Sequence, residues 1–211
     1  KIYVYIMILL TELQYFAPII SYKNSINNKY IKLEQYERWQ KMSFRNRCII
    51  AGANGLIDLS IPIEGSRNTA AFIRDVKIDN VLKWQMIHWR GITSAYNRAP
   101  WFEFYADELL QFYETRYTYL WDWNLDLMYW VLKQLKVEVK VDFTDRYEKQ
   151  ITDEDIADYR NKILPKNSIR YAGECPVYSQ VFEHRLGFHP NLSIIDLLFC
   201  EGNNAAGLLR S

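Results

Sequence analysis

The chain has 211 residues, a length typical of one domain that buries its own core without disulfides or metal ions. Its 26 Lys and Arg nearly balance its 25 Asp and Glu, and no block of like charge occurs, which argues against partners such as nucleic acid or a membrane surface. Its three cysteines lack metal-site spacing, so we expect reduced thiols, no metal ion and a cytoplasmic location.

The N-terminal third predicts a strand, a helix and a second strand. The apolar run from Ile2 to Leu10 is too short to span a bilayer, so we expect no membrane insertion. Residues 1–6, ahead of Met7, are either an upstream extension or part of the single domain formed by residues 1–211. Strands over residues 6–10 and 30–33 with a helix over 18–26 form a βαβ unit, which predicts the α/β class with a parallel or mixed sheet.

A β-hairpin is predicted around Asn54-Gly55, because both residues accept the positive φ of a two-residue turn. The strands then cover residues 46–51 and 56–63, with alternating apolar residues on one face. This register places Arg47 opposite Pro62 and Arg45 opposite Glu64. Both arginines would lie on the polar face, while Asn46 would point towards the core.

Several aromatic-rich helices follow. Asp79-Asn80 is expected to cap a helix that carries His88 and stops at Ala99-Pro100. Residues 102–135 predict two helices, separated near residues 121–124. After these helices, residues 137–143 predict a late strand.

The C-terminal third combines a charged surface region with a final helix. Residues 145–168 are interpreted as surface, with a helical start signal at residues 152–155. The pattern from Ser193 to Asp196 predicts a capping box that opens a last helix ending at Gly202.

Short blocks along most of the chain resemble those of the WbqC-like family of bacteria. The order and spacing of these blocks carry the resemblance, which runs from Met7 nearly to Ser211: Phe44-Arg45-Asn46-Arg47, Ala53-Asn54-Gly55, Leu59-Ser-Ile-Pro62, Ile73-Arg74-Asp75, Trp84-Gln85-x-x-His88-Trp89, Ser94-Ala95-Tyr96, Pro100-x-Phe102-Glu103-x-Tyr105, Asp122-x-Asn124, Tyr178-Ser-Gln180-Val-Phe182 and Pro190-Asn191-Leu-Ser193-Ile-Ile-Asp196. The resemblance implies an association with O-antigen and other surface-glycan gene clusters, and a glycine or aminoacyl transferase role has been suggested for this family. Longer relatives carry a His-Gln-Pro-x-Tyr-x-Pro-like turn after the first strand, whereas this chain has Glu12-Leu-Gln-Tyr-Phe-Ala-Pro18.

Arg45 and Arg47 form the first candidate site. Two guanidinium groups on one face of a strand can bind a phosphate or carboxylate as a fork. The alternative is a solvated face on which Arg45 pairs with Glu64 across the hairpin. Asn46 between the two arginines would help to orient a substrate, because an inward-pointing amide needs polar partners.

His88 and Glu103 are the candidate catalytic residues. A histidine titrates near neutral pH and suits proton transfer, although a histidine on an aromatic helix is often a hydrogen-bonded core residue. Glu103 could act as a carboxylate in acid–base work, or it could stabilise the first turn of a helix. Three further side chains are expected to orient the substrate: Tyr105, Gln180 and Asn191.

The leading hypothesis is an acyl or aminoacyl transferase, with glycine as one candidate group, that modifies a sugar or sugar nucleotide in surface-glycan biosynthesis. It requires five side chains to converge within about 10 Å around one concave site: Arg45, Arg47, His88, Glu103 and Gln180. No nucleotide-binding glycine motif occurs, so the cofactor stays unknown. The alternatives are a non-catalytic accessory protein with an aromatic surface around Trp121, Trp123 and Tyr129, and a sugar-binding module.

Overall fold

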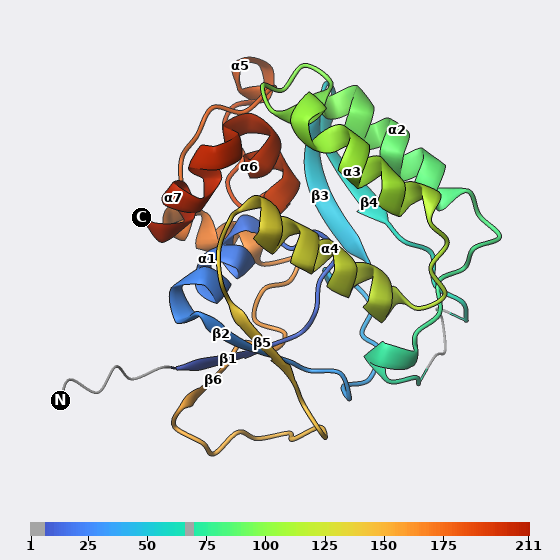
Figure 1. The fold of residues 1–211 in the computed structure, drawn as a ribbon, viewed down its shortest axis with the longest axis vertical. Coiled ribbons are helices and arrows are strands. Elements are labelled where there is room, and N and C mark those ends of the chain that lie inside the picture. The colour runs from blue at the N-terminus through green and yellow to red at the C-terminus, as the bar shows by residue number, and fades with distance from the viewer. Residues whose placement is uncertain (1–6, 66–69) are drawn as a thin grey trace.

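The computed structural model describes residues 7–65 and 70–211 (Figure 1). The predicted extension at residues 1–6 lies outside these ranges. In chain order the elements are β1 (Ile8–Thr11), α1 (Ile19–Asn28), β2 (Tyr30–Leu33), β3 (Arg47–Gly52), β4 (Gly55–Ser60), the 3₁₀ turn η1 (Ile73–Asp75), α2 (Trp84–Tyr96), α3 (Phe102–Glu114), α4 (Leu120–Gln134), β5 (Lys140–Phe143), β6 (Ile156–Asp158), η2 (Ser168–Glu174), α5 (Glu183–Leu186), α6 (Ile194–Glu201), η3 (Gly202–Asn204) and α7 (Ala205–Arg210).

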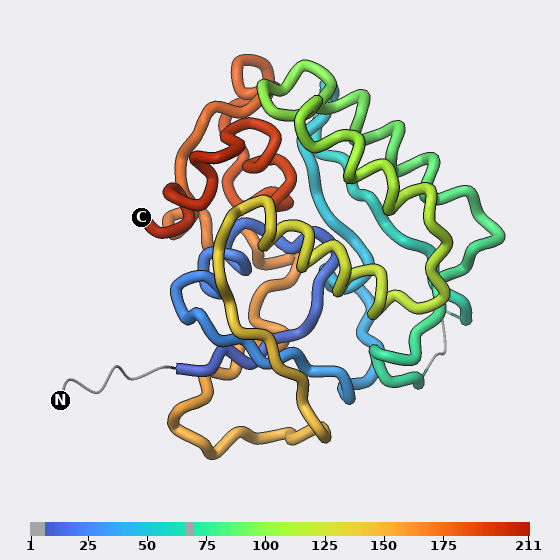
Figure 2. The backbone as a smooth tube through the Cα atoms, viewed as in Figure 1, coloured from blue at the N-terminus to red at the C-terminus, as the bar shows by residue number. Residues whose placement is uncertain are grey.

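The predicted βαβ opening is confirmed, and with it the α/β class. β1, α1 and β2 lead into a four-stranded sheet of order β5-β2-β1-β6 in which each neighbouring pair is parallel. α1 and α4 cover one face of this sheet, where Leu9, Ile31 and Leu33 meet Tyr22 and Leu132. The chain between β5 and β6 runs below the sheet in Figure 2 and borders the other face.

The predicted hairpin is confirmed, but its loop lies one residue earlier. Gly52 pairs with Gly55, so the two-residue loop is residues 53–54 and Arg47 lies opposite Ser60. Gly55 has a φ of 131°, which favours glycine directly after the loop. Because the register differs from the predicted one by two residues, the buried face is unchanged, and Leu59 is 4% exposed.

Two of the predicted helix boundaries are wrong. α3 and α4 separate at residues 115–119, because Leu120 N–H donates to the Val76 carbonyl and holds the preceding chain extended. The residues proposed as the break, 121–124, instead form the first turn of α4. Asp79 and Asn80 do not cap α2: Asp79 accepts from the Val81 N–H, and Asn80 donates to a carbonyl in the α3–α4 loop.

The helix signal at residues 152–155 is also wrong, because this segment leads into strand β6. Asp153 accepts from the Asp155 N–H and forms a local turn. The Asp155 carbonyl then accepts from the Ile8 N–H and aligns β6 beside β1. The region 145–168 is therefore not all surface, since Ile163 is 5% exposed.

α6 is a buried helix that packs against α1, α3 and α7 and against strand β3 of the hairpin. Its residues from Ile194 to Cys200 are buried. The Ser193 N–H donates to Ile49 in β3, and the Trp101 N–H donates to Phe199 in α6. None of the helices formed by the described residues combines the length and the apolarity needed to cross a bilayer.

Candidate functional site

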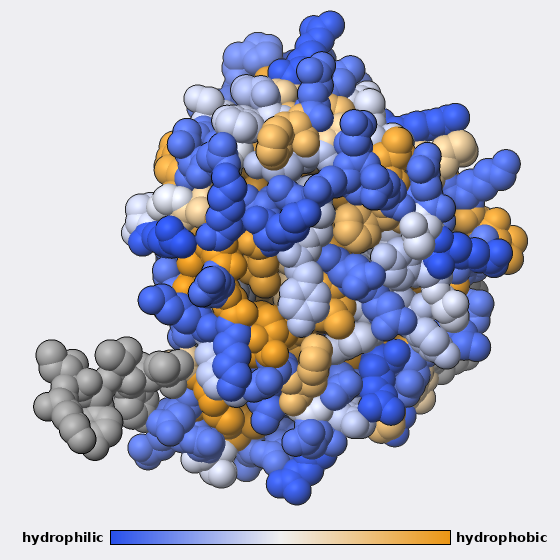
Figure 3. All heavy atoms as spheres, in the orientation of Figure 1, coloured by the Kyte–Doolittle hydropathy of each residue, from blue (hydrophilic) through white to orange (hydrophobic). Residues whose placement is uncertain are grey.

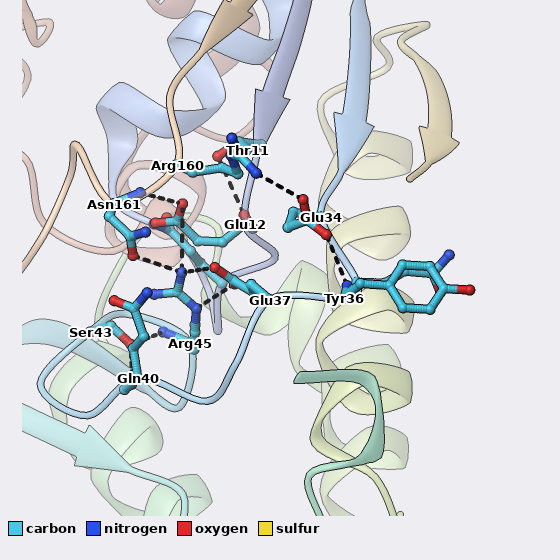
Figure 4. A network of polar contacts seen from close by, with 12 residues as sticks. Thr11, Glu12, Glu34, Tyr36, Glu37, Gln40, Ser43, Arg45, Arg160 and Asn161 are labelled. Atoms are coloured by element: carbon cyan, nitrogen blue, oxygen red, sulfur yellow. Dashed lines mark hydrogen bonds and ion pairs between the residues drawn. The ribbon is translucent and has the colours of Figure 1, made fainter. Parts of the chain in front are cut away.

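Polar side chains gather where the parallel strands end. Glu12 follows β1, Glu34 follows β2, Thr144 follows β5, and Arg160 and Asn161 come shortly after β6. In open parallel sheets, ligands bind outside the carboxyl ends of the strands, at the point where the strand order reverses. In this sheet the chain leaves β1 towards β2, whereas β6 lies on the opposite side of β1. The strand order therefore reverses between β1 and β6. Figure 4 shows the resulting group, which we call the carboxyl-edge network.

Arg45 forms the buried centre of this network. Its Nε and Nη2 donate to the two carboxylate oxygens of Glu37 at 2.7 and 2.6 Å, and Nη2 also donates to the Asn161 side chain at 2.8 Å. Nη2 lies 4.0 Å from the Glu12 carboxylate. The side chain of Arg45 is 0% exposed. Burial raises the pKa of Glu37, and the hydrogen bonds and charge of Arg45 oppose that rise.

A second part of the network surrounds Glu34. Its carboxylate accepts from the Tyr36 N–H, from the Thr144 hydroxyl and from Arg160 at 2.9, 2.9 and 3.0 Å. Arg160 also binds Asp158 through two side-chain hydrogen bonds. The whole network thus holds four carboxylates against two guanidinium groups: Glu12, Glu34, Glu37 and Asp158 against Arg45 and Arg160. Within the described ranges, no three His, Cys, Asp or Glu side chains form a group that could hold a metal ion.

Two cavities flank the network, one on each face of the sheet. The open-face cavity has a volume of about 320 Å³ and lies on the face that carries no helix; it is lined by Leu10, Lys32, Glu34, Thr144, Asp145, Arg146, Glu148, Ile151 and Ile156. The α-face cavity, about 40 Å³, lies between the sheet, α1 and α4 and reaches Glu12 and Gln14. Figure 3 shows apolar side chains gathered over the α1, α4 and β5 region of the molecule.

The predicted arginine pair is separated, which corrects the expectation that both side chains lie on the polar face. β3 begins only at Arg47, so the alternation of a strand does not extend to Arg45, which is buried and pairs with Glu37 instead of Glu64. Arg47 is partly exposed and pairs with Asp58 at 2.8 Å. Asn46 donates to the Ile61 carbonyl and so anchors the hairpin.

His88 is a buried, hydrogen-bonded residue of the aromatic core. Its Nδ1 lies 3.1 Å from the Tyr15 hydroxyl, its Nε2 lies 3.3 Å from the Ser60 carbonyl, and the side chain stacks edge-on against Trp84. Burial lowers the pKa of His88 to about 4, so the imidazole is neutral at physiological pH. Asp58, the partner of Arg47, acts electrostatically on His88.

Glu103 and Tyr105 lie in the first turns of α3. The Glu103 side chain is exposed there, and its negative charge is stabilising at a helix N-terminus. Tyr105 is 2% exposed, and its hydroxyl has no hydrogen-bond partner among the described residues. Neither residue borders one of the two cavities.

Gln180 belongs to a different buried cluster, around Asp196. The Asp196 carboxylate accepts from the hydroxyls of Tyr96 and Tyr178, both at 2.6 Å. Gln180 donates to the Tyr178 hydroxyl and to the His189 carbonyl. Asp196 therefore does not act in a capping box, because its carboxylate faces these phenols. Burial raises its pKa.

Asn191 and Ser193 hold the turn before α1. The Asn191 side chain accepts from the Ile20 N–H at 3.0 Å, and the Leu192 carbonyl accepts from the Ile19 N–H. The Ser193 hydroxyl donates to the Phe16 carbonyl, so it does not cap α6. These bonds occupy the N-terminal amides of α1, which would otherwise be free to bind an anion.

The five side chains expected to converge fall into separate groups. No hydrogen bond or ion pair in the described part of the chain joins any two of Arg45, Arg47, His88, Glu103 and Gln180. Sequence reasoning missed the other members of the carboxyl-edge network. Glu34 and Glu12 had a usable signal, since Glu34 directly follows the predicted strand 30–33 and Glu12 comes two residues after the predicted strand 6–10, whereas Glu37 and Arg160 had none.

These features define an α/β protein with a buried charge network at the carboxyl edge of a parallel sheet. The sequence model of the WbqC-like protein family matches residues 14–170, and the chain therefore belongs to that family, as predicted. The chain is also 24% identical over 197 residues to the uncharacterized protein Rv1507c of Mycobacterium tuberculosis, covering 82% of this chain and 84% of that protein. No solved structure matches the chain.

Proposed function

We propose that this WbqC-like protein is a transferase that binds a sugar or sugar nucleotide in the open-face cavity. It adds an acyl or aminoacyl group to an amine or hydroxyl of that sugar, in bacterial surface-glycan biosynthesis. The nucleophilic atom of the sugar gains the acyl group and loses a proton. The leaving group of an activated acyl donor departs with the electrons of the broken bond and takes up a proton, so the exchange balances. The family resemblance supports the pathway, and the geometry of the carboxyl edge supports the site.

The open-face cavity is the observation that carries this proposal. Its volume of about 320 Å³ falls in the range of small-molecule sites, roughly 300–1,000 Å³. It lies between the open face of the sheet and the β5–β6 connection, and it reaches the carboxyl edge at Glu34 and Thr144. The carboxyl edge is the general location of ligands in this class of fold. Sugar hydroxyls both donate and accept hydrogen bonds, and the lining offers two cations, Lys32 and Arg146, and three carboxylates, of which Glu148 pairs with Arg146.

Lys32 replaces the arginine pair as the group that binds the anionic part of a sugar nucleotide. It lies on central strand β2, is partly buried, and has no carboxylate of the described residues within 4.0 Å of its ammonium group, although its charge acts on Asp142 in the neighbouring strand. Arg45 and Arg47 are each already paired with a carboxylate. Asp145 and Glu148 are exposed in the same lining and can accept hydrogen bonds from hydroxyls. His88 and Glu103 border neither cavity, so the proposal gives them no chemical role.

The test is a binding titration of uridine diphosphate sugars by two-dimensional amide NMR, with mass spectrometry of the sugar after incubation with acyl donors. We expect shifts confined to the lining of the open-face cavity, and a loss of affinity of about tenfold in Lys32→Gln. Lys140→Gln is the matched control, because Lys140 lies on the neighbouring strand, pairs with Asp142 at 3.3 Å and lines neither cavity. The proposal fails if no sugar nucleotide shifts the cavity residues, or if the two variants bind equally.

The two non-catalytic alternatives are separated by the same experiment. A sugar-binding module would give the same NMR shifts without any mass change in the sugar. The accessory protein was expected to use an aromatic surface, but Trp121 and Trp123 are 7% and 0% exposed, and only Tyr129 of that set is exposed, at 44%. That particular surface is therefore not formed.

A further inference from the structure

The open face of the parallel sheet is covered by the chain between β5 and β6 and not by a helix. Parallel sheets in α/β proteins normally carry helices on both faces. Here α1 and α4 lie on one face, and the β5–β6 connection borders the other (Figure 2). Because β5 and β6 are the two edge strands, this connection spans the width of the sheet. Leu10 on central strand β1 lines the cavity of this face and is nevertheless 2% exposed, so the connection helps to shield it from water.

The middle of this connection, residues 145–152, is only weakly attached to the rest of the protein, and we call it the lid segment. In the described chain, none of its backbone N–H or C=O groups forms a backbone hydrogen bond. Its residues are exposed except for Ile151, which lines the open-face cavity. The Arg146–Glu148 ion pair, at 2.7 Å, lies within the segment itself. A stretch with few buried apolar contacts and few backbone hydrogen bonds opens at a low cost in free energy.

Both ends of the lid segment, by contrast, are fixed. At one end the Thr144 N–H donates to the Leu33 carbonyl, and the Thr144 carbonyl accepts from the Gln35 side chain. At the other end the Asp155 carbonyl accepts from the Ile8 N–H. The segment can therefore move between two fixed points without disturbing β5 or β6.

Two contacts hold the lid segment against the sheet. The guanidinium group of Arg160 lies over the Tyr147 ring, 5.0 Å from its centroid, and Arg160 in turn binds Glu34 of the cavity lining at 3.0 Å. Ile151 supplies an apolar contact, since it lines the cavity together with Leu10. A cation–π contact at an exposed site is weak, so it can break and form again.

We propose that the lid segment opens to admit the ligand of the open-face cavity and closes over it, with Tyr147 and Ile151 as the contacts that hold it closed. More than half of the residues that line the cavity come from the β5–β6 connection, so a ligand there contacts the connection and the sheet together. Ligand binding therefore favours the closed state, because only that state supplies the full set of contacts. This inference rests on the proposed function in that the ligand is a sugar nucleotide, but the opening itself is measured without any ligand.

Two adjacent residues of β1 provide a matched pair of probes. Leu9 and Leu10 are each 2% exposed, and they line the α-face and the open-face cavity, respectively. The three native cysteines are buried. We would introduce Leu9→Cys and Leu10→Cys separately and follow their reaction with iodoacetamide by mass spectrometry. Unfolding kinetics of each variant in urea give the rate that global unfolding alone allows. Leu10→Cys should react at least about tenfold faster than Leu9→Cys, because its cover opens locally whereas α1 and α4 do not.

Variants of the lid segment test the two holding contacts in the Leu10→Cys background. Ile151→Ser should speed the reaction about fivefold, because apolar burial is lost. Tyr147→Leu should speed it about two- to fivefold, because the ring of the cation–π contact is lost. Lys149→Ser is the matched control, since Lys149 is exposed and forms no hydrogen bond or ion pair with the described residues. None of these changes should alter the rate for Leu9→Cys.

Two outcomes would overturn the lid: a Leu10→Cys reaction no faster than that of Leu9→Cys, or equal rates in Ile151→Ser, Tyr147→Leu and the Lys149→Ser control. A bound uridine diphosphate sugar should slow the Leu10→Cys reaction about tenfold at saturation. A sugar that shifts the cavity residues in the NMR titration but leaves this rate unchanged would refute closure over the ligand. If no such sugar binds, the proposed function fails, whereas a fast Leu10→Cys reaction that Ile151→Ser accelerates would still support the lid.

Discussion

Replacing Arg45 by methionine should be far more damaging than the same change at Arg47, although the two arginines are two residues apart in the sequence. Arg45 is 0% exposed and makes three side-chain hydrogen bonds, two of them to Glu37. Methionine keeps much of the side-chain volume but leaves the Glu37 carboxylate buried without its partner. Breaking a buried ion pair in this way costs about 3–5 kcal/mol.

Arg47→Met is the matched control. The side chains of its pair, Arg47 and Asp58, are 19% and 45% exposed, so water screens the interaction. Exposed or partly exposed pairs contribute about 0–1 kcal/mol. The double variant Arg45→Met with Glu37→Leu should recover most of the loss, because it removes both charges together.

The cost of Arg45→Met should also depend on pH. Burial already raises the pKa of Glu37, so its contribution to stability is present at low pH and is lost as the pH rises through the folded-state pKa. Without Arg45 the pKa rises further, and protonation relieves the buried charge in acid. The loss relative to the parent chain should therefore be smaller at pH 5 than at pH 8.

Urea unfolding at both pH values measures these free energies directly. A loss under about 1 kcal/mol for Arg45→Met at pH 8, or an equal loss for Arg47→Met, would show that the buried charge network does not form as described.

Three further outcomes can be checked by the same unfolding assay. Tyr178→Phe removes a 2.6 Å hydrogen bond to the buried Asp196 carboxylate and should cost about 1.5–3 kcal/mol. Tyr22→Phe removes a hydroxyl without a partner among the described residues and should change stability by less than about 0.5 kcal/mol. Equal losses of stability in the two variants would contradict this assignment of hydrogen-bond partners. The pKa of His88 is lowered to about 4, so the folded protein resists protonation of this imidazole. Lowering the pH from 8 to 5 should therefore cost the parent chain about 2 kcal/mol of unfolding free energy that a His88→Gln variant does not lose. If NMR showed that the His88 imidazole becomes protonated between pH 8 and pH 5, this prediction would be wrong. Gly202 has a φ of 51°, and an added Cβ would lie 2.1 Å from an indole ring, so Gly202→Ala should cost at least about 1–3 kcal/mol. Gly207 in α7 has no atom within 4 Å of its added Cβ, so Gly207→Ala should be neutral or stabilising. A larger loss of stability in Gly207→Ala than in Gly202→Ala would contradict this packing.

Local patterns predicted the elements whose hydrogen bonds lie close along the chain. The alternation from Leu56 to Ile63 gave the buried face of the hairpin correctly even though the loop was placed one residue late, because a shift of register by two keeps each side chain on its face. The βαβ unit and most of the helical lengths follow from the periods of strand and helix in the same way.

The pairing of distant side chains was not predictable from such patterns. Residues 152–155 carry a helix signal, yet β1 recruits the next residues as a parallel strand, since backbone pairing along a sheet edge outweighs a weak local preference. Likewise, Arg45 and Arg47 look equivalent in sequence, and only the folded chain brings Glu37 and Asn161 to one of them.

By itself, therefore, the sequence determined the α/β class, the order of the first strands and helices, and the family. The tertiary structure alone decided which polar groups are buried together and where the open-face and α-face cavities lie. The physical reason is that secondary structure depends on neighbours a few residues apart, whereas a site at the carboxyl edge of a sheet is assembled from strand ends whose positions are fixed only when the strands pair.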